Sequence, residues 1–129
     1  MTNAPPAPVV LVIDDEPLIR NLLCDMIEAR GCVVAAVDKI GAARQWLAEH
    51  VPHAVFCDVM LPDGTGFELC KWIRNQASLK KTPLVMMTAI SDEETAQDAV
   101  ELLGIVDFLR KPFDLSQLDG KLDKVLPAR

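Results

Sequence analysis

The feature that most constrains the fold is an alternation of short aliphatic runs with longer segments of helical periodicity. The first run is Val9–Ile13, five consecutive aliphatic residues, which is typical of a strand covered on both faces in a parallel sheet. Similar runs predict four further strands, at 33–37, 54–57, 84–87 and 107–110. Because parallel neighbours need a crossover connection, the pattern predicts an α/β fold with helices on both faces of the sheet.

The segments between these runs predict five helices. In the first, Pro17 suits the first helical position and Gly31 the C′ position after the last turn. Its apolar residues recur at helical spacing and are expected to face inward: Leu18, Ile19, Leu22, Leu23, Met26 and Ile27.

The later helices show the same spacing. We expect Ser91 or Asp92 to cap the fourth helix, Gly104 to close it, and Asp114 to cap the fifth. The residues expected to face inward are Ala42, Ala43, Trp46 and Leu47 in the second helix, which ends before Pro52; Phe67, Cys70 and Ile73 in the third; Ala96, Ala99, Val100 and Leu103 in the fourth; and Leu115, Leu118, Leu122 and Val125 in the fifth.

Five strands alternating with five helices predict a (βα)5 doubly wound, flavodoxin-like fold with a five-stranded parallel sheet in the order 2-1-3-4-5. The 129 residues suffice for one such domain, whereas a closed eight-stranded barrel needs about twice that length. Residues 1–8 contain three prolines and are expected to be a flexible leader, followed by one domain at 9–126 and a C-terminal tail at 127–129.

Composition excludes several classes of function. The net charge of −6 and the absence of a basic cluster longer than Lys80-Lys81 disfavour direct binding of nucleic acid. No apolar stretch approaches the roughly 20 residues that span a bilayer, and no signal peptide is recognisable, so we expect a cytoplasmic protein with no membrane association. The four cysteines are irregularly spaced among apolar residues and are expected to be buried free thiols.

Polar residues follow four of the predicted strands at the point where each strand ends. Carboxyl ends of parallel strands share one edge of the sheet, and ligands bind there beside the point where the winding reverses. We therefore expect a crevice that contains Asp14, Asp15 and Asp58 and is flanked by Thr88 and Lys111. Grouped carboxylates favour a hard divalent cation such as Mg²⁺. An aspartate beside that ion can act as a nucleophile toward a phosphoryl group, while a lysine and a hydroxyl stabilise the charge on the transferred oxygens.

Four segments resemble a known family. Residues 10–17 (VLVIDDEP), 56–69 (FCDVMLPDGTGFEL), 83–89 (PLVMMTA) and 107–113 (DFLRKPF) are similar to the receiver, or phosphoacceptor, domains of two-component response regulators, which include the chemotaxis response regulator. The resemblance extends from Val9 to about Leu126. It implies a signalling switch of a phosphorelay, which catalyses only its own phosphorylation and dephosphorylation and is otherwise not an enzyme.

The resemblance also implies a role for individual residues. Asp58 would accept the phosphoryl group from a phosphohistidine, with Mg²⁺ held by Asp14, Asp15, Asp58 and the carbonyl of Met60, and with Thr88 and Lys111 contacting the phosphoryl oxygens. Thr88 and Phe108 would form the switch, and the Lys111–Pro112 peptide bond would be cis.

The implied partners are proteins. A sensor histidine kinase or a histidine phosphotransfer protein would supply the phosphoryl group. An output protein or domain would bind the face made by the fourth helix, the fifth strand and the fifth helix, or two copies would pair there as a homodimer. The sequence is consistent with a stand-alone receiver and with a fragment of a longer regulator.

Other interpretations stay open for single residues. Asp14 and Asp15 could cap the helix that starts at Pro17, Thr88 could cap the next helix, Lys111 could be a surface lysine and Phe108 an ordinary core residue.

Three other functions compete. A phosphatase of the haloacid dehalogenase type needs an acid two residues after the nucleophile, where Met60 stands. A flavin binder would have its phosphate repelled by the Asp14-Asp15-Glu16 run, and the chain has no tyrosine to stack on the flavin. A scaffold that binds partners without phosphorylation would not need the full set of site residues.

The chain departs from the family pattern at two places. Ile105 follows Gly104 where the family usually has alanine, which places a larger residue beside the fifth strand. Met60 and Ile90 are apolar and offer no side chain to orient an attacking water, so we expect a long-lived acyl phosphate.

Overall fold

A computed structural model describes residues 6–89 and 93–126. The expected cap at Ser91 or Asp92, Ile90, residues 1–5 of the expected leader and the expected tail at 127–129 lie outside the described residues, as do the side chains of 93–96 and 99. Within the described ranges, no helix has the length and apolar character needed to cross a membrane.

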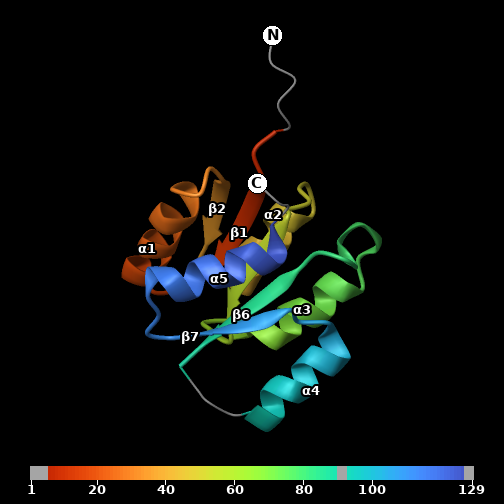
Figure 1. The fold of residues 1–129 in the computed structure, drawn as a ribbon. Helices are drawn as coiled ribbons and strands as arrows, with labels where there is room; N and C mark the ends of the chain where they lie inside the picture. Colours follow the sequence, from red (N-terminus) through yellow and green to blue (C-terminus); the bar gives the residue numbers. More distant parts are fainter. Residues whose placement is uncertain (1–5, 90–92, 127–129) are drawn as a thin grey trace.

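The central sheet has the predicted topology. It comprises β1 (Val9–Ile13), β2 (Val33–Val37), β3 (Ala54–Asp58), β6 (Leu84–Thr88) and β7 (Asp107–Arg110). The strands are parallel in the order β2-β1-β3-β6-β7, which confirms the α/β doubly wound fold and the predicted order 2-1-3-4-5 (Figure 1).

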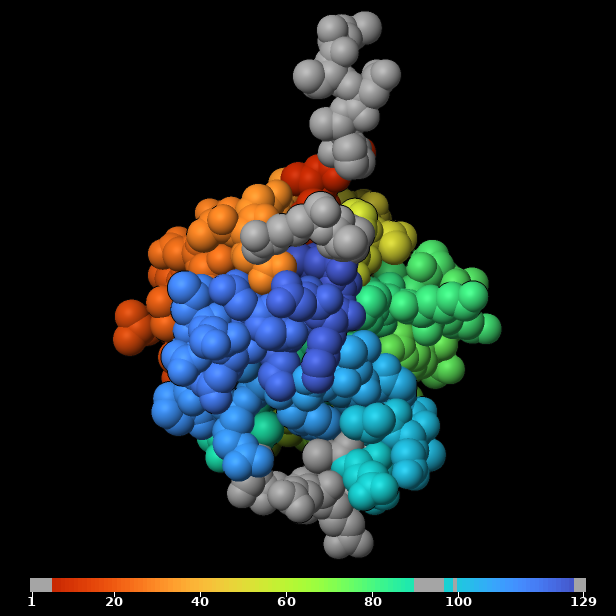
Figure 2. Space-filling view, in the orientation of Figure 1, coloured from red at the N-terminus to blue at the C-terminus, as the bar shows by residue number. Residues whose placement is uncertain are grey.

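Five helices cover the two faces of this sheet. They are α1 (Pro17–Glu28), α2 (Ile40–Leu47), α3 (Gly66–Arg74), α4 (Glu93–Leu103) and α5 (Leu115–Val125). Helices α1 and α5 pack on the face that carries Val10, Val12 and Phe56, and α5 covers the middle of this side of the molecule (Figure 2). Helices α2, α3 and α4 pack on the opposite face, where Ile105 is 2% exposed and belongs to the core.

Two short elements were not predicted from the sequence. A hairpin of β4 (Met60–Leu61) and β5 (Gly64–Thr65) lies between β3 and α3, and a 3₁₀ turn, η1 (Ala77–Leu79), follows α3. The hairpin has only two residues in each strand, which is too short to leave an alternating pattern in the sequence.

Four apolar residues predicted to face inward are exposed instead. Leu18 is 81% exposed, Leu22 45%, Val100 41% and Leu115 52%. On α1, the buried residues are Leu23 and Ile27, and only Ile19 and Met26 pack partly against them. A helix that packs on a sheet buries only one stripe of side chains along its length. Leu22 lies about 100° around the helix axis from the buried Leu23 and therefore falls outside this stripe. The predicted set of inward-facing residues was thus too wide.

The predicted helix ends are mostly confirmed. Pro17 occupies the first turn of α1, Gly104 follows α4 with φ of +64°, and Asp114 caps α5 in a reciprocal capping box with Gln117. Gly31 adopts the left-handed conformation, with φ of +85°, but the C-cap of α1 is Ala29. Arg30 therefore occupies C′, and the prediction that Gly31 lies there was wrong by one position.

Candidate functional site

Two buried carboxylates meet at the carboxyl edge of the sheet. Asp58 is the last residue of β3, and Asp14 directly follows β1, its neighbour in the sheet. Asp14 is fully buried and Asp58 is 7% exposed. Both strands are apolar and almost entirely buried, and each ends beside a carboxylate. The two carboxylates therefore lie together at the point where the winding of the sheet reverses, as predicted.

Lys111 lies between these carboxylates. It follows β7, and its Nζ donates a hydrogen bond of 2.8 Å to Asp58 Oδ2. The same Nζ forms ion pairs with Asp14 Oδ2 at 2.8 Å and Glu16 Oε1 at 3.5 Å. The Lys111–Pro112 peptide bond is cis.

Burial and charge shift the pKa values of this pair. Burial raises the pKa of the Asp58 carboxyl group, and the hydrogen bonds from Lys111 Nζ and from the Met60 backbone N–H oppose that rise without cancelling it. Burial disfavours the ammonium form of Lys111, but Asp14 and Asp58 outweigh this effect, so the pKa of Lys111 is raised. The lysine is therefore held in its charged form.

The donor atoms of the site suit a hard divalent cation. Carboxylate oxygens of Asp14, Glu16 and Asp58 all lie within 4.8 Å of one another. Asp14 Oδ1 accepts a hydrogen bond of 2.9 Å from the Glu16 backbone N–H, and the buried Asp14 Oδ2 is paired with Lys111 Nζ at 2.8 Å. Three carboxylates against one ammonium leave an excess of negative charge, and all the ligand atoms are oxygens, as Mg²⁺ prefers.

A small pocket opens beside Asp58. Its volume is about 270 Å³, and it is lined by Asp15, Glu16, Asp58, Met60, Thr88, Ala89 and Lys111. The predicted metal and phosphoryl residues thus lie together at this edge: all but Asp14 line the pocket, and the buried Asp14 is paired with Lys111, which lines it. Glu16, which was not among the predicted metal ligands, belongs to the carboxylate cluster, whereas Asp15 does not.

Phe108, the predicted switch residue, lies outside the pocket lining. It sits on β7 opposite Met86 of β6, is partly buried and packs against the core beneath α2, α3 and α4. Thr88 is two residues further along β6 and reaches the pocket.

Gly66 allows α3 to approach the end of β3, and it was not among the predicted site residues. A Cβ atom at this position would lie 2.2 Å from the backbone oxygen of Asp58, so only glycine fits. The Gly66 backbone N–H also donates a hydrogen bond of 2.7 Å to the Val59 oxygen. No local pattern could reveal this approach, because it depends on how α3 meets the end of β3.

Asp63 is a second residue whose role was missed. It was not among the predicted site residues, and its carboxylate accepts hydrogen bonds from the backbone N–H groups of Ile40 and Gly41 at the start of α2. A cap supplied from 22 or 23 positions away leaves no signal at capping spacing.

The cysteines take no part in the acidic pocket. All four are free, and Cys32, Cys57 and Cys70 are buried as predicted, whereas Cys24 is half-buried. Burial raises the pKa of the Cys70 thiol to about 12, so this thiol stays protonated.

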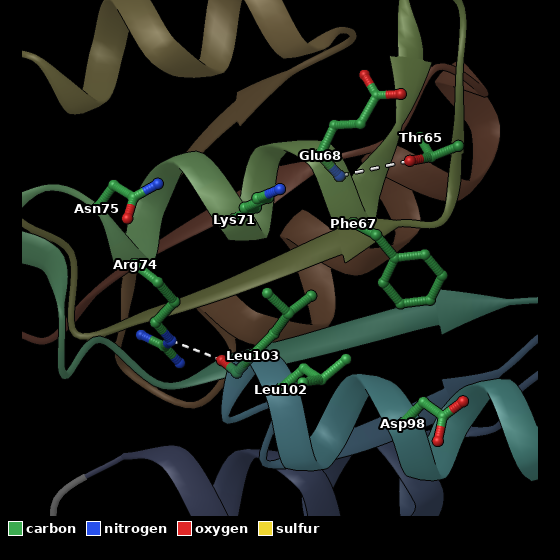
Figure 3. A pocket seen from close by; sticks show the side chains of 9 residues that line it. All are labelled: Thr65, Phe67, Glu68, Lys71, Arg74, Asn75, Asp98, Leu102 and Leu103. Atoms are coloured by element: carbon green, nitrogen blue, oxygen red, sulfur yellow. Dashed lines mark hydrogen bonds between the residues drawn. The ribbon is translucent and has the colours of Figure 1, made fainter.

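A second, larger hollow lies between α3 and α4. This groove of about 620 Å³ shares no residue with the acidic pocket, and Phe67, Leu102 and Leu103 contribute its apolar surface (Figure 3). At one end, Arg74 donates hydrogen bonds to the backbone oxygens of Leu103 at 2.6 Å and Gly104 at 3.1 Å. Arg74 therefore satisfies carbonyls at the C-terminus of α4.

Comparison with known proteins identifies the family. The response regulator receiver domain model matches residues 10–123. The chain is 38% identical over 117 residues to the transcriptional regulatory protein GltR of Pseudomonas aeruginosa, covering 91% of this chain and 48% of GltR. It is 30% identical over 120 residues to the protein PilG of the same species, covering 92% of this chain and 87% of PilG.

Solved structures agree with this assignment. The chemotaxis response regulator CheY4 of Vibrio cholerae has a TM-score of 0.87 at 29% identity, covering 94% of this chain and 100% of CheY4. The chain spans about half the length of GltR and of the phosphate regulon regulator PhoB of Escherichia coli. The aliphatic strands, the acidic edge and these matches lead to one conclusion: the chain belongs to the response regulator receiver domain family.

Proposed function

We propose that Asp58 is the residue of this receiver domain that accepts the phosphoryl group. Receiver domains are signalling switches that interact with histidine kinases. The observation that carries the assignment is the position of the Asp58 carboxylate, which lines the acidic pocket and is held by Lys111 Nζ at 2.8 Å and by the Met60 backbone N–H at 3.1 Å. An oriented, partly desolvated carboxylate is a competent nucleophile for phosphoryl transfer.

The reaction requires few groups. An oxygen of Asp58 forms a bond to phosphorus while the bond between phosphorus and the imidazole nitrogen of a phosphohistidine breaks, and the electron pair leaves with that nitrogen. Lys111 supplies positive charge beside the transferred oxygens, and the Thr88 hydroxyl lines the same pocket. The donor is a phosphohistidine of a sensor histidine kinase or of a histidine phosphotransfer protein.

We propose that Mg²⁺ is the cofactor. The residues that would hold it are Asp14, Asp15 and Asp58 together with the Met60 carbonyl, with Glu16 nearby. When bound, the ion would offset the negative charge of the carboxylates and of the phosphoryl oxygens. The excess of three clustered carboxylates over the single ammonium of Lys111 is the structural feature that best supports a cation here.

We propose that phosphorylation is read at the face formed by α4, β7 and α5. Thr88 and Phe108 would act as the switch, and the pairing of their strands, β6 and β7, supports this proposal. Exposed Val106 and Leu115 give the face an apolar surface on which an output protein or domain could dock. Homodimerisation through this face is a second outcome. The net charge of −6 disfavours direct nucleic-acid binding by this domain, and we propose that it acts through protein contacts in the cytoplasm.

The intact mass of the protein after incubation with acetyl phosphate tests the assignment. The wild type with Mg²⁺ is expected to gain one phosphoryl group, and neither the D58N variant nor the wild type in EDTA should gain it. An adduct that persists in D58N would place the phosphoacceptor elsewhere.

A further inference from the structure

The tip of the β4–β5 hairpin is fastened to the start of α2 by one side chain. Asp63 Oδ1 accepts a hydrogen bond of 2.9 Å from the Ile40 backbone N–H, and Asp63 Oδ2 accepts one of 3.0 Å from Gly41. The first backbone N–H groups of a helix have no partner within the helix. Lys39, the N-cap residue of α2, makes no side-chain cap, so Asp63 supplies the cap that this helix lacks.

Charge and packing strengthen this contact. The hydrogen bonds from Gly41 and Ile40 lower the pKa of Asp63, so the carboxylate is ionised, the form that a helix N-terminus favours. Gly64, the next residue, has φ of +148°, and a Cβ there would lie 3.0 Å from Ile40 Cδ1. The hairpin backbone therefore packs closely against the first residue of α2.

The other end of the hairpin belongs to the acidic pocket. Met60 pairs with Thr65 in the hairpin, and its backbone N–H donates a hydrogen bond of 3.1 Å to Asp58 Oδ1. A hairpin with two residues per strand is marginal by itself, so its geometry depends on what fixes its ends. The base is fixed by the hydrogen bond between Gly66 and Val59, and the tip by Asp63.

We propose that Asp63 is a positioning residue for the phosphorylation site, and that it acts by holding the backbone of Met60 in place beside Asp58. The inference rests on the proposed function, since it takes the Met60 carbonyl as a ligand of Mg²⁺. Outer groups that orient metal ligands commonly change metal affinity when they are removed.

Calorimetric titration with Mg²⁺ alone tests this role, using D63A, D63N and the control D107N. D63A is expected to bind Mg²⁺ roughly tenfold more weakly than the wild type. D63N keeps one acceptor oxygen, and its affinity for Mg²⁺ should lie between those of the wild type and D63A.

The control variant is D107N. Asp107 starts β7 at the opposite edge of the sheet and pairs with Lys121, so D107N removes a comparable contact and should bind Mg²⁺ as the wild type does. Without metal, amide hydrogen exchange at Met60 should be faster in D63A than in D107N.

The outcomes separate the two proposals. Wild-type affinity in D63A would refute the positioning role alone. Equal weakening in D63A and D63N would also refute it, because the lost negative charge would then explain the effect. A wild-type chain that binds no Mg²⁺ would refute the proposed metal site and the inference with it.

Discussion

Lys111 and Asp58 share a hydrogen bond of 2.8 Å although they lie 53 positions apart in the sequence. The same ammonium lies 2.8 Å from Asp14 Oδ2, so one lysine bridges two carboxylates that are almost inaccessible to solvent. Buried carboxylates repel each other strongly unless a positive charge lies between them. Lys111 thus supports both the fold and the reactivity of this edge of the sheet.

Replacing Lys111 by methionine should destabilise the protein. The variant keeps much of the aliphatic stem but leaves Asp14 and Asp58 without their cation, at a cost of about 3 kcal/mol in the free energy of unfolding. Urea unfolding in EDTA would measure this loss. Because Mg²⁺ can replace part of the missing charge, it should stabilise K111M more than the wild type. Equal stabilisation of both proteins would contradict replacement of the lysine charge by the ion, and no stabilisation of either protein would contradict a cation site formed by these carboxylates.

The G66A variant should be strongly impaired, because its new Cβ would lie 2.2 Å from the Asp58 backbone oxygen. The end of β3 must move or the helix must shift, and such overpacking costs about 1–3 kcal/mol. Chemical denaturation and phosphorylation by acetyl phosphate should both show the defect. G120A is the matched control, since a Cβ on Gly120 meets nothing within 4 Å and should stabilise α5 by about 0.5–1 kcal/mol. Unchanged phosphorylation in G66A would refute the close approach.

Much of this arrangement could be predicted from the sequence because it depends on local patterns. The aliphatic run before Asp58 specifies a buried strand, and its abrupt end places the carboxylate at the sheet edge. Asp63 could not be assigned, because its partners on α2 become neighbours only when the chain folds. Leu18 was wrongly predicted to be buried for a similar reason. Periodicity shows which side of a helix faces the core, but it does not show how wide a strip of that side the rest of the protein covers.

The Asp107 cluster gives the stability of the domain a defined pH dependence. Burial opposes ionisation of Asp107, but hydrogen bonds from Lys124, Lys121 and the Phe108 backbone outweigh it, so the pKa of Asp107 is lowered in the folded state. Its stabilising effect is therefore present above the unfolded-state pKa of about 3.9 and is lost as the pH falls through the folded-state value.

The D107N variant isolates this effect. At pH 7 it should be less stable than the wild type by about 1 kcal/mol. The difference should narrow below about pH 5 and disappear once Asp107 is protonated in the folded wild type. Urea denaturation of both proteins at several pH values measures it, and a difference that is constant from pH 7 to pH 3 would contradict the ionic role of Asp107.

The side chain of Met60 should make dephosphorylation slow. It is 62% exposed and lines the acidic pocket, yet it has no polar group to orient water. The phosphorylated wild type with Mg²⁺ should therefore lose phosphate slowly, and M60E should lose it at least tenfold faster because a carboxylate can act as a general base. M60L serves as the control and should match the wild type. A half-time of seconds in the wild type would contradict this account.

Chemical trapping of the acyl phosphate identifies the aspartate that is phosphorylated. Borohydride reduces an aspartyl phosphate to homoserine, so peptide mass mapping after acetyl phosphate and Mg²⁺ treatment reports which aspartate was modified. We expect homoserine at position 58, dependent on Mg²⁺ and with Asp14 and Asp15 intact. Homoserine at another position, with Asp58 unmodified, would contradict this expectation.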